Sequence, residues 1–234
     1  MGILPRMNYR QLLERLHAYL DPEVYLEIGV NAGGSLRLAR RRAIAIDRNF
    51  RPLQPDLRER PGFSFHEQTS DDFFRDHRPE EVLGDRRVDF AFIDGLHEAG
   101  QVLRDVVNVE RWSHPWTIVA LHDCWARDPE IASRVRQRPG WAGDAWRVVP
   151  FLQRHRPDLD LLVLDAPPTG LVLIGGMNAD APDVLPLASE LMDPPDLSHD
   201  EQVREFIAFR DRQSAADPEA FLAPLEGAGG PAAG

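Results

Sequence analysis

The chain has 234 residues, of which 43% are hydrophobic and 28% charged, as in a globular protein large enough for one α/β domain. Its formal net charge of −11 argues against a nucleic-acid partner or an anionic membrane surface, and its single cysteine excludes an internal disulfide and favours the cytoplasm. No signal peptide is expected from the first sixteen residues, and no apolar run approaches the ~20 residues that span a bilayer.

Segments with helical and strand periodicity alternate along most of the chain. Helices are expected over 8–20, 33–41, 70–77, 98–112 and 144–155, and strands over 24–29, 43–47, 63–68, 88–94 and 116–123. This alternation predicts a doubly wound, Rossmann-like α/β sheet, mostly parallel, with helices on both faces. Two more strands, over 158–166 and 170–176, are joined by a turn too short for a parallel connection, so the final strand should be antiparallel.

The composition changes near residue 177. We expect one domain over 1–176, which includes the N-terminal helix, and a helical extension over 177–226 with an amphipathic helix near 200–212. That helix could pack on the sheet or on a second copy of the chain, so a homodimer is expected. The glycine-rich tail, 227–234, is expected to be disordered.

The segment VYLEIGVNAGGSL reads as a strand, a glycine-bearing turn and the start of a helix, where backbone N–H groups can approach a ligand. Asp47 ends the next strand, twenty residues after Glu27, and an acid there can hold the hydroxyls of a ribose. Asn31 stands where dinucleotide sites need a glycine, and a carboxylate at Glu27 would repel a diphosphate. A cationic nucleoside such as S-adenosylmethionine therefore fits better than a dinucleotide.

Two later strands, in FIDGLH and VALHD, both end in an acid and a histidine. Because the carboxyl ends of parallel strands share one edge of the sheet, Asp94, His97, His122 and Asp123 should converge. We interpret Asp94, His122 and Asp123 as ligands of Mg²⁺ or Mn²⁺, since two carboxylates and an imidazole can hold such a cation. Asp94 and His97 are the catalytic candidates, with His97 as a general base; alternatively, His97 only caps the next helix or orders Asp94.

The order E-x-G-x-x-x-G-G-S, AIAID, FIDGLH and IVALHD, over about residues 20–176, resembles class I S-adenosylmethionine-dependent methyltransferases. More narrowly, it resembles the metal-dependent sugar O-methyltransferases of macrolide, aminocoumarin and mycobacterial methylmannose polysaccharide pathways, together with the cephalosporin-hydroxylase-like proteins. The resemblance implies methyl transfer from S-adenosylmethionine to a hydroxyl of a saccharide or glycoside, assisted by Mg²⁺. In that branch, acids at the positions of Asp94 and Asp123 bind Mg²⁺, whereas His122 occupies a position that can carry a second acid.

The resemblance also implies a set of residues that contact the cofactor, with those after the third strand near the adenine. They are Glu27, Gly29, Asn31, Gly33, Ser35, Asp47, Gln68, Thr69, Ser70, Asp71 and Asp94. Aromatic and polar side chains that follow the fifth strand are candidates for binding the acceptor, because aromatic faces stack on sugar rings. They are Trp125, Trp141, Asp144, Trp146 and Arg147.

Three other functions stay open at this point. One is a metal-independent methyltransferase for a phenol, carboxylate or amine, with His97 as the base. Another is a nicotinamide-dependent dehydrogenase, against which Asn31 and the absence of lysine both speak. The third is a sensor or scaffold that binds the cofactor without turnover.

Overall fold

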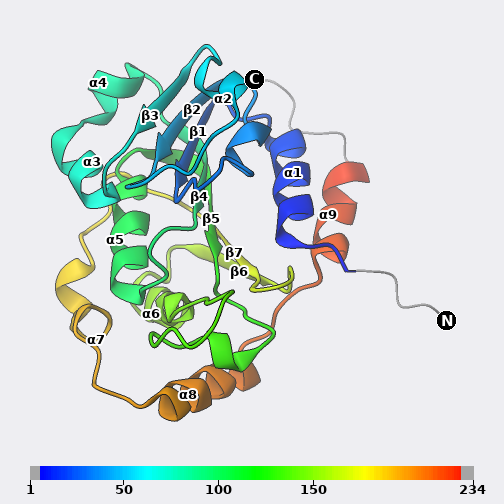
Figure 1. Ribbon diagram of the computed structural model, residues 1–234, viewed down its shortest axis with the longest axis vertical. Coiled ribbons are helices and arrows are strands. Elements are labelled where there is room, and N and C mark those ends of the chain that lie inside the picture. The colour runs from blue at the N-terminus through cyan, green and yellow to red at the C-terminus, as the bar shows by residue number, and fades with distance from the viewer. Residues whose placement is uncertain (1–5, 228–234) are drawn as a thin grey trace.

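Seven strands form one sheet in the order β3-β2-β1-β4-β5-β7-β6 (Figure 1). The strands are β1 Val24–Ile28, β2 Arg42–Ile46, β3 Phe63–His66, β4 Val88–Ile93, β5 Ser113–His122, β6 Asp160–Leu164 and β7 Leu171–Gly175. The computed structural model describes residues 6–227, with side chains through residue 225. Neighbours among β1 to β5 are parallel, whereas β7 runs antiparallel to β5 and β6. The predicted sheet, including its antiparallel final strand, is confirmed.

The helices expected over residues 1–176 are present except the one after β1, and α4 (Pro79–Leu83) is a helix that was not expected. They are α1 Tyr9–Leu20, α2 Pro55–Arg58, α3 Ser70–Asp76, α4 Pro79–Leu83, α5 Ala99–Glu110, α6 Val148–His155, α7 Ser189–Met192, α8 His199–Arg212 and α9 Pro218–Gly227, with 3-10 turns η1 Leu36–Leu38, η2 Pro129–Ile131, η3 Ala145–Arg147 and η4 Leu185–Leu187. The helix expected over 33–41 is only η1, because two glycines disfavour a helix at its start. Pro150 does not interrupt α6, since it lies in the first turn, where its missing N–H has no helical partner.

Alternate residues of each strand face two separate cores. In β1, Leu26 belongs to the core that includes Leu103 of α5, whereas Tyr25 belongs to the core that includes Leu12 of α1. Helices α3, α5, α6, α7 and α8 cover the first face, and α1 with α9 covers the second (Figure 1). Because β1 to β5 run parallel, their carboxyl ends, and the side chains that follow them, lie along one edge of the sheet.

The C-terminal extension packs on both faces of its own chain. Phe206 of α8 enters the first core, the backbone of Ala216 pairs with Leu164 of β6, and Leu222 of α9 enters the second core. Gly227, where the predicted disordered tail begins, is the last residue of α9, and residues 228–234 lie outside the described residues. Within the described chain, no helix is both long and apolar enough to cross a membrane.

The loop after β1 lies directly against the end of β4. Gly29 has a φ of +86°, and a Cβ atom placed on it would lie 2.0 Å from the carbonyl oxygen of Asp94. Only glycine tolerates both this backbone conformation and this approach. Gly33 also has a positive φ, but a Cβ atom there would meet the side chains of Leu57 and Leu53, so Gly33 serves packing on α2.

We predict that Gly29→Ala destabilises the fold by at least ~2 kcal/mol, because the methyl group must displace the Asp94 backbone. Gly34→Ala is the matched control, since a Cβ atom at Gly34 meets nothing within 4 Å. Urea unfolding measures both effects. Equal stability of the two variants would show that the loop moves away from β4 without cost.

His17 is a buried histidine on α1 whose two ring nitrogens have no hydrogen-bond partner among residues 6–227. Its ring packs edge-on against Tyr25 and Phe90, with centroid distances of 4.5 and 5.1 Å. Burial, with a smaller effect of the charge of Arg40, lowers the pKa of His17 to about 4. The unfolded chain takes up this proton near pH ~6.5. Neutral His17 therefore contributes its full stability above pH ~6.5, and loses it as the pH falls toward 4.

We predict that His17→Phe reduces the loss of stability in acid, because the variant has no proton to take up at this buried site. Between pH 7 and pH 5, the free energy of unfolding of the wild type should fall by about 2 kcal/mol more than that of the variant. Urea unfolding at the two pH values measures this difference. Equal losses in both proteins would contradict the prediction.

Candidate active site

A cavity of about 720 Å³ lies at the carboxyl ends of the central parallel strands, where a doubly wound sheet binds its ligand. Eleven of the residues singled out in the sequence line it: Gly29, Asn31, Asp47, Gln68, Thr69, Ser70, Asp94, His97, His122, Asp123 and Trp141. Others singled out there do not line it: Glu27, Gly33, Ser35, Asp71, Trp125, Asp144, Trp146 and Arg147. Lining residues that the sequence analysis missed include Tyr9, Asp105, Arg136 and Thr169.

Glu27 lies beneath the cavity rather than in its wall. The hydroxyl groups of Tyr25 and Ser35 donate to its carboxyl group over 2.8 and 2.6 Å. Burial raises the pKa of Glu27 to about 8, although these two hydrogen bonds partly oppose the rise. Glu27 is therefore mostly neutral at pH 7. The raised pKa weakens the sequence-based argument that its charge repels a diphosphate, and in the structure Glu27 ties Ser35, in the loop after β1, to the strand itself.

Asp47 is oriented by the backbone of the two loops beside it. The N–H of Asn31 donates to Asp47 Oδ2 over 2.7 Å, and the N–H of Asn49 donates to Oδ1 over 2.9 Å. An ionised carboxylate accepts about four hydrogen bonds, so two positions remain for hydroxyl groups in the cavity. Asn31 contributes its backbone, in a left-handed conformation with φ of 53°.

The loop after β3 contacts α5 through a buried acid. Asp105 is only 1% exposed, accepts a hydrogen bond from the Ser70 hydroxyl over 2.6 Å, and accepts another from Gln101 over 3.0 Å. Burial raises the pKa of Asp105 to about 7, although both hydrogen bonds oppose the rise. Asp71 lies outside the cavity wall, because it bonds to Gln101 and pairs with Arg104 at 3.3 Å. The hydrogen bond between Ser70 and Asp105 therefore holds the loop after β3 against α5 at this side of the cavity.

The two strand ends rich in acid and histidine meet, as the topology predicted. His97 Nε2 lies 3.3 Å from Asp94 Oδ1, and His97 Nδ1 lies 3.0 Å from Asp123 Oδ2. His122 Nδ1 lies 3.0 Å from Asp94 Oδ1 and 3.3 Å from Asp123 Oδ1. Each carboxylate thus faces both imidazoles at the floor of the cavity.

These four side chains compensate one another's charge. Burial by itself lowers the pKa of His97, but the adjacent carboxylates of Asp123 and Asp94 outweigh it and raise the pKa to about 10. The pKa of His122 is likewise well above its ordinary value, because the two carboxylates outweigh burial. Conversely, burial raises the pKa of Asp94 and Asp123, but the histidines outweigh it and hold both below the usual range. At pH 7 two imidazolium ions therefore face two carboxylates.

The side chains also fit a divalent cation, and they bring a second histidine, His97, close to the two acids. Among the described residues, ligand atoms of Asp94, His97 and Asp123 lie within 4.8 Å of one another. Asp123 Oδ2 is buried and, within the described residues, accepts no well-aligned hydrogen bond, although His97 Nδ1 lies 3.0 Å away, so it is available as a ligand. His122 instead contacts both acids through Nδ1, and its Nε2 lies 3.0 Å from Thr169 Oγ1. His97 is therefore a candidate ligand beside the two acids, in addition to the predicted His122, which contacts the same acids.

Asp144, expected at the acceptor, is buried and holds the turn that carries His97. Its backbone N–H donates to the His97 carbonyl oxygen over 3.0 Å, and its Oδ1 accepts the N–H of Ala99 over 2.8 Å at the start of α5. His97 has a left-handed backbone, with φ of 49°. A Cβ atom on Gly143 would lie 1.9 Å from the His97 carbonyl oxygen, so glycine is required there.

Of the five acceptor candidates, only Trp141 lines the cavity. Its ring stacks on His97, with centroids 5.5 Å apart and an angle of 21°, and its carbonyl oxygen accepts from His97 Nδ1 over 3.0 Å. Trp125, Trp146 and Arg147 pack instead against side chains of α8. The aromatic cluster in the sequence is therefore mostly core.

Tyr9 forms a wall of the cavity that the sequence did not reveal. Its ring centroid lies 4.1 Å from that of His122. The Tyr9 N–H donates to the carbonyl oxygen of Pro167 over 3.2 Å, which joins the start of α1 to the β6–β7 turn. Nothing local in the sequence marks Tyr9, because only tertiary packing brings it to the end of β5.

Comparison with known proteins gives a family for the central part of the chain. Residues 26–124, from β1 to just beyond β5, match the family described as a methyltransferase domain. None of the curated proteins matches the sequence significantly. The residues matched include all four members of the acid–histidine set.

Solved structures show the same fold over most of the chain. The O-methyltransferase of Bacillus cereus, in complex with S-adenosylhomocysteine, has a TM-score of 0.53 at 15% identity and covers 71% of this chain and 80% of its own. TomG of Streptomyces achromogenes, an O-methyltransferase of tomaymycin synthesis in complex with S-adenosylmethionine, has a TM-score of 0.51 at 15% identity, covering 72% and 79%. The S-adenosylhomocysteine-bound methyltransferase PaMTH1 of Podospora anserina has a TM-score of 0.52 at 14% identity, covering 72% and 78%. Residues 26–124 thus match a methyltransferase domain, and the chain has the fold of these O-methyltransferase structures.

Proposed function

We propose that this methyltransferase uses S-adenosylmethionine to methylate a hydroxyl group of a sugar, with a divalent cation at Asp94 and Asp123. The observation that carries the proposal is that the acid–histidine set opens into the same cavity as Asp47. The donor and the acceptor can then meet within one cavity, whose volume lies in the range of small-molecule sites. Methyl transfer needs that proximity more than any other contribution.

The cofactor side of the cavity is the edge formed by the loops after β1, β2 and β3. The two free acceptor positions of Asp47 suit the ribose hydroxyls, and Gln68, Thr69 and Ser70 line the part where the adenine would lie. Asp94, a member of the acid–histidine set, lines the cavity next to this cofactor side. This arrangement directs the sulfonium end of the cofactor toward Asp94.

The cation side is supported by the chemistry of the donor set. Two carboxylates with one imidazole suit Mn²⁺, and two carboxylates with water suit Mg²⁺. When bound, such a cation lowers the pKa of a coordinated hydroxyl group. Asp94 and Asp123 would hold it, and His97 would then lose the negative neighbours that now raise its pKa.

The protein's part in the reaction is to orient the hydroxyl group and take its proton. The hydroxyl oxygen attacks the methyl carbon; the new C–O bond forms as the C–S bond breaks, and the electron pair stays on sulfur. His97, held by the Trp141 carbonyl oxygen and the Asp144 turn, accepts the proton. The rings of Trp141 and Tyr9 line the cavity beside this set and offer apolar faces to a sugar ring.

The cofactor half of the proposal predicts binding of S-adenosylhomocysteine, measured by isothermal titration. Asp47→Ala should weaken the affinity by about ten- to a hundredfold, because it removes charge-assisted hydrogen bonds to the ribose. Asp56→Ala is the matched control, since Asp56 is exposed on α2 and pairs with Arg60. If the wild type does not bind S-adenosylhomocysteine, the proposed function is wrong at its base.

The metal half predicts binding of Mn²⁺, measured by electron paramagnetic resonance of the free ion. Asp123→Ala should abolish binding, because it removes a buried ligand, whereas Asp128→Ala, at an exposed acid paired with Arg138, should retain it. His97→Gln separates two roles: it loses Mn²⁺ if His97 is a ligand, and keeps it if His97 serves only as the base. Turnover unchanged by EDTA would instead favour the metal-independent methyltransferase.

A further inference from the structure

Three arginines line the cavity with guanidinium groups that have no partner: Arg48, Arg51 and Arg136. Within residues 6–227, none of these three guanidinium groups takes part in a hydrogen bond, an ion pair or a ring contact. The chain contains no lysine and has a net charge of −11, so acidic partners for arginine are abundant on its surface. Cationic groups left unpaired in a concave site attract an anionic ligand.

The segment that carries Arg136 provides an internal comparison. Arg134 Nε donates to the buried carboxylate of Asp144 over 3.1 Å, and Arg138 pairs with Asp128. Arg136, between them, has neither kind of contact and lines the cavity. Arg134 is thus neutralised by a buried acid and Arg138 by a surface acid, whereas the guanidinium group of Arg136 is available to a ligand in the cavity.

Arg136 lies on the acceptor side of the cavity. The same loop stacks Trp141 on His97, so Arg136 shares the wall that faces the acid–histidine set. Arg48 and Arg51 instead follow Asp47, and the N–H of Arg51 donates to the Asn31 carbonyl oxygen, which places them on the cofactor side.

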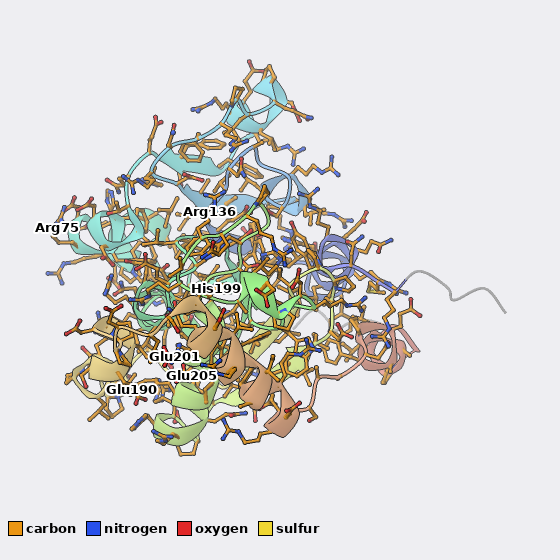
Figure 2. All side chains as sticks on the ribbon, turned by 60° about the horizontal axis from the view of Figure 1, so that its bottom comes forward. Arg75, Arg136, Glu190, His199, Glu201 and Glu205 are labelled. Atoms are coloured by element: carbon orange, nitrogen blue, oxygen red, sulfur yellow. The ribbon has the colours of Figure 1, made fainter. Side chains whose placement is uncertain are left out.

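The acidic side chains of the C-terminal segment do not neutralise Arg136. In Figure 2, Arg136 lies apart from Glu201 and Glu205 of α8 and from Glu190 of α7. Glu205 pairs with Arg147, and Glu190 with Arg154.

We propose that the acceptor carries an anionic group, a carboxylate or a phosphate, which Arg136 binds while the hydroxyl group to be methylated lies at His97. The inference rests on the function proposed above and names its substrate class. A guanidinium group binds either anion through two parallel hydrogen bonds. With Arg136 holding the anionic group and His97 facing the hydroxyl group, the acceptor has one orientation in the cavity.

The test measures binding of paired probes to the protein saturated with S-adenosylhomocysteine, by isothermal titration. The first pairs are 4-nitrophenyl uronides of the gluco, galacto and manno series against the corresponding neutral glycosides. The second pair is glucose 6-phosphate against glucose. We expect the anionic member of at least one kind of pair to bind about ten- to a hundredfold more tightly. The preference should shrink as the salt concentration rises.

Arg136→Gln should abolish the preference and leave the affinity for S-adenosylhomocysteine unchanged. Arg138→Gln, two residues along the same loop, should keep it, because Arg138 is exposed and does not line the cavity. The uronides and the phosphate distinguish a carboxylate from a phosphate as the recognised group.

Each other outcome has one meaning. If the protein binds S-adenosylhomocysteine but no anionic probe more tightly than its neutral partner, the inference is overturned while the proposed function stands. A loss of S-adenosylhomocysteine affinity in Arg136→Gln would assign Arg136 to the cofactor, and an equal loss of preference in Arg138→Gln would show a non-specific effect of charge. Either result also overturns the inference.

Discussion

The contact between Gly29 and the backbone of Asp94 is the constraint on which the rest of the site depends. It brings the loop that shapes the cofactor side within van der Waals distance of the strand end that begins the acid–histidine set. Asp94 N–H also donates to the Ile28 carbonyl oxygen over 2.8 Å, so the two strand ends are joined by the backbone. A methyl donor bound at one side and a hydroxyl group bound at the other would then be neighbours without any movement of the fold. Holding two reactants side by side in this way lowers the entropic part of the barrier.

The second constraint is electrostatic. Two carboxylates buried at a strand edge would be costly unless they were paired, and His97 and His122 pair with both. The histidines are not equivalent: His122 is held between the acids, Thr169 and the Tyr9 ring, whereas His97 faces the cavity under Trp141. His122 is therefore enclosed by neighbouring side chains, while His97 lines the cavity, as its proposed role as the base requires.

The C-terminal extension supports the site from a distance. Gln202 of α8 accepts the N–H of Arg134 over 2.8 Å, and the Trp141 indole donates to the carbonyl oxygen of Ser133. Because Trp141 in turn accepts from His97, a helix far from the sheet edge helps to fix the His97 imidazole. The loop before α6 is thus held at both ends, which suits a segment that must present side chains to a ligand in one geometry.

The alternation of strand and helix patterns determined the parallel sheet, and the short link between the last two strands determined the antiparallel final strand, because both follow from local pattern and connection length. The position of Asp94 and Asp123 after parallel strands determined that they lie near each other, because the carboxyl ends of such strands share one edge. The sequence could not decide which histidine would stand as a ligand or which aromatic residue would reach the cavity. Asp123 has a φ of 65°, and that left-handed turn at the end of β5 brings its carboxylate beside His97, whereas a continued strand would put His122 and Asp123 on opposite faces of the sheet. Trp125 and Trp146 are as aromatic as Trp141, but α8 covers them and leaves Trp141 free, and such coverage depends on elements that lie far apart in the chain.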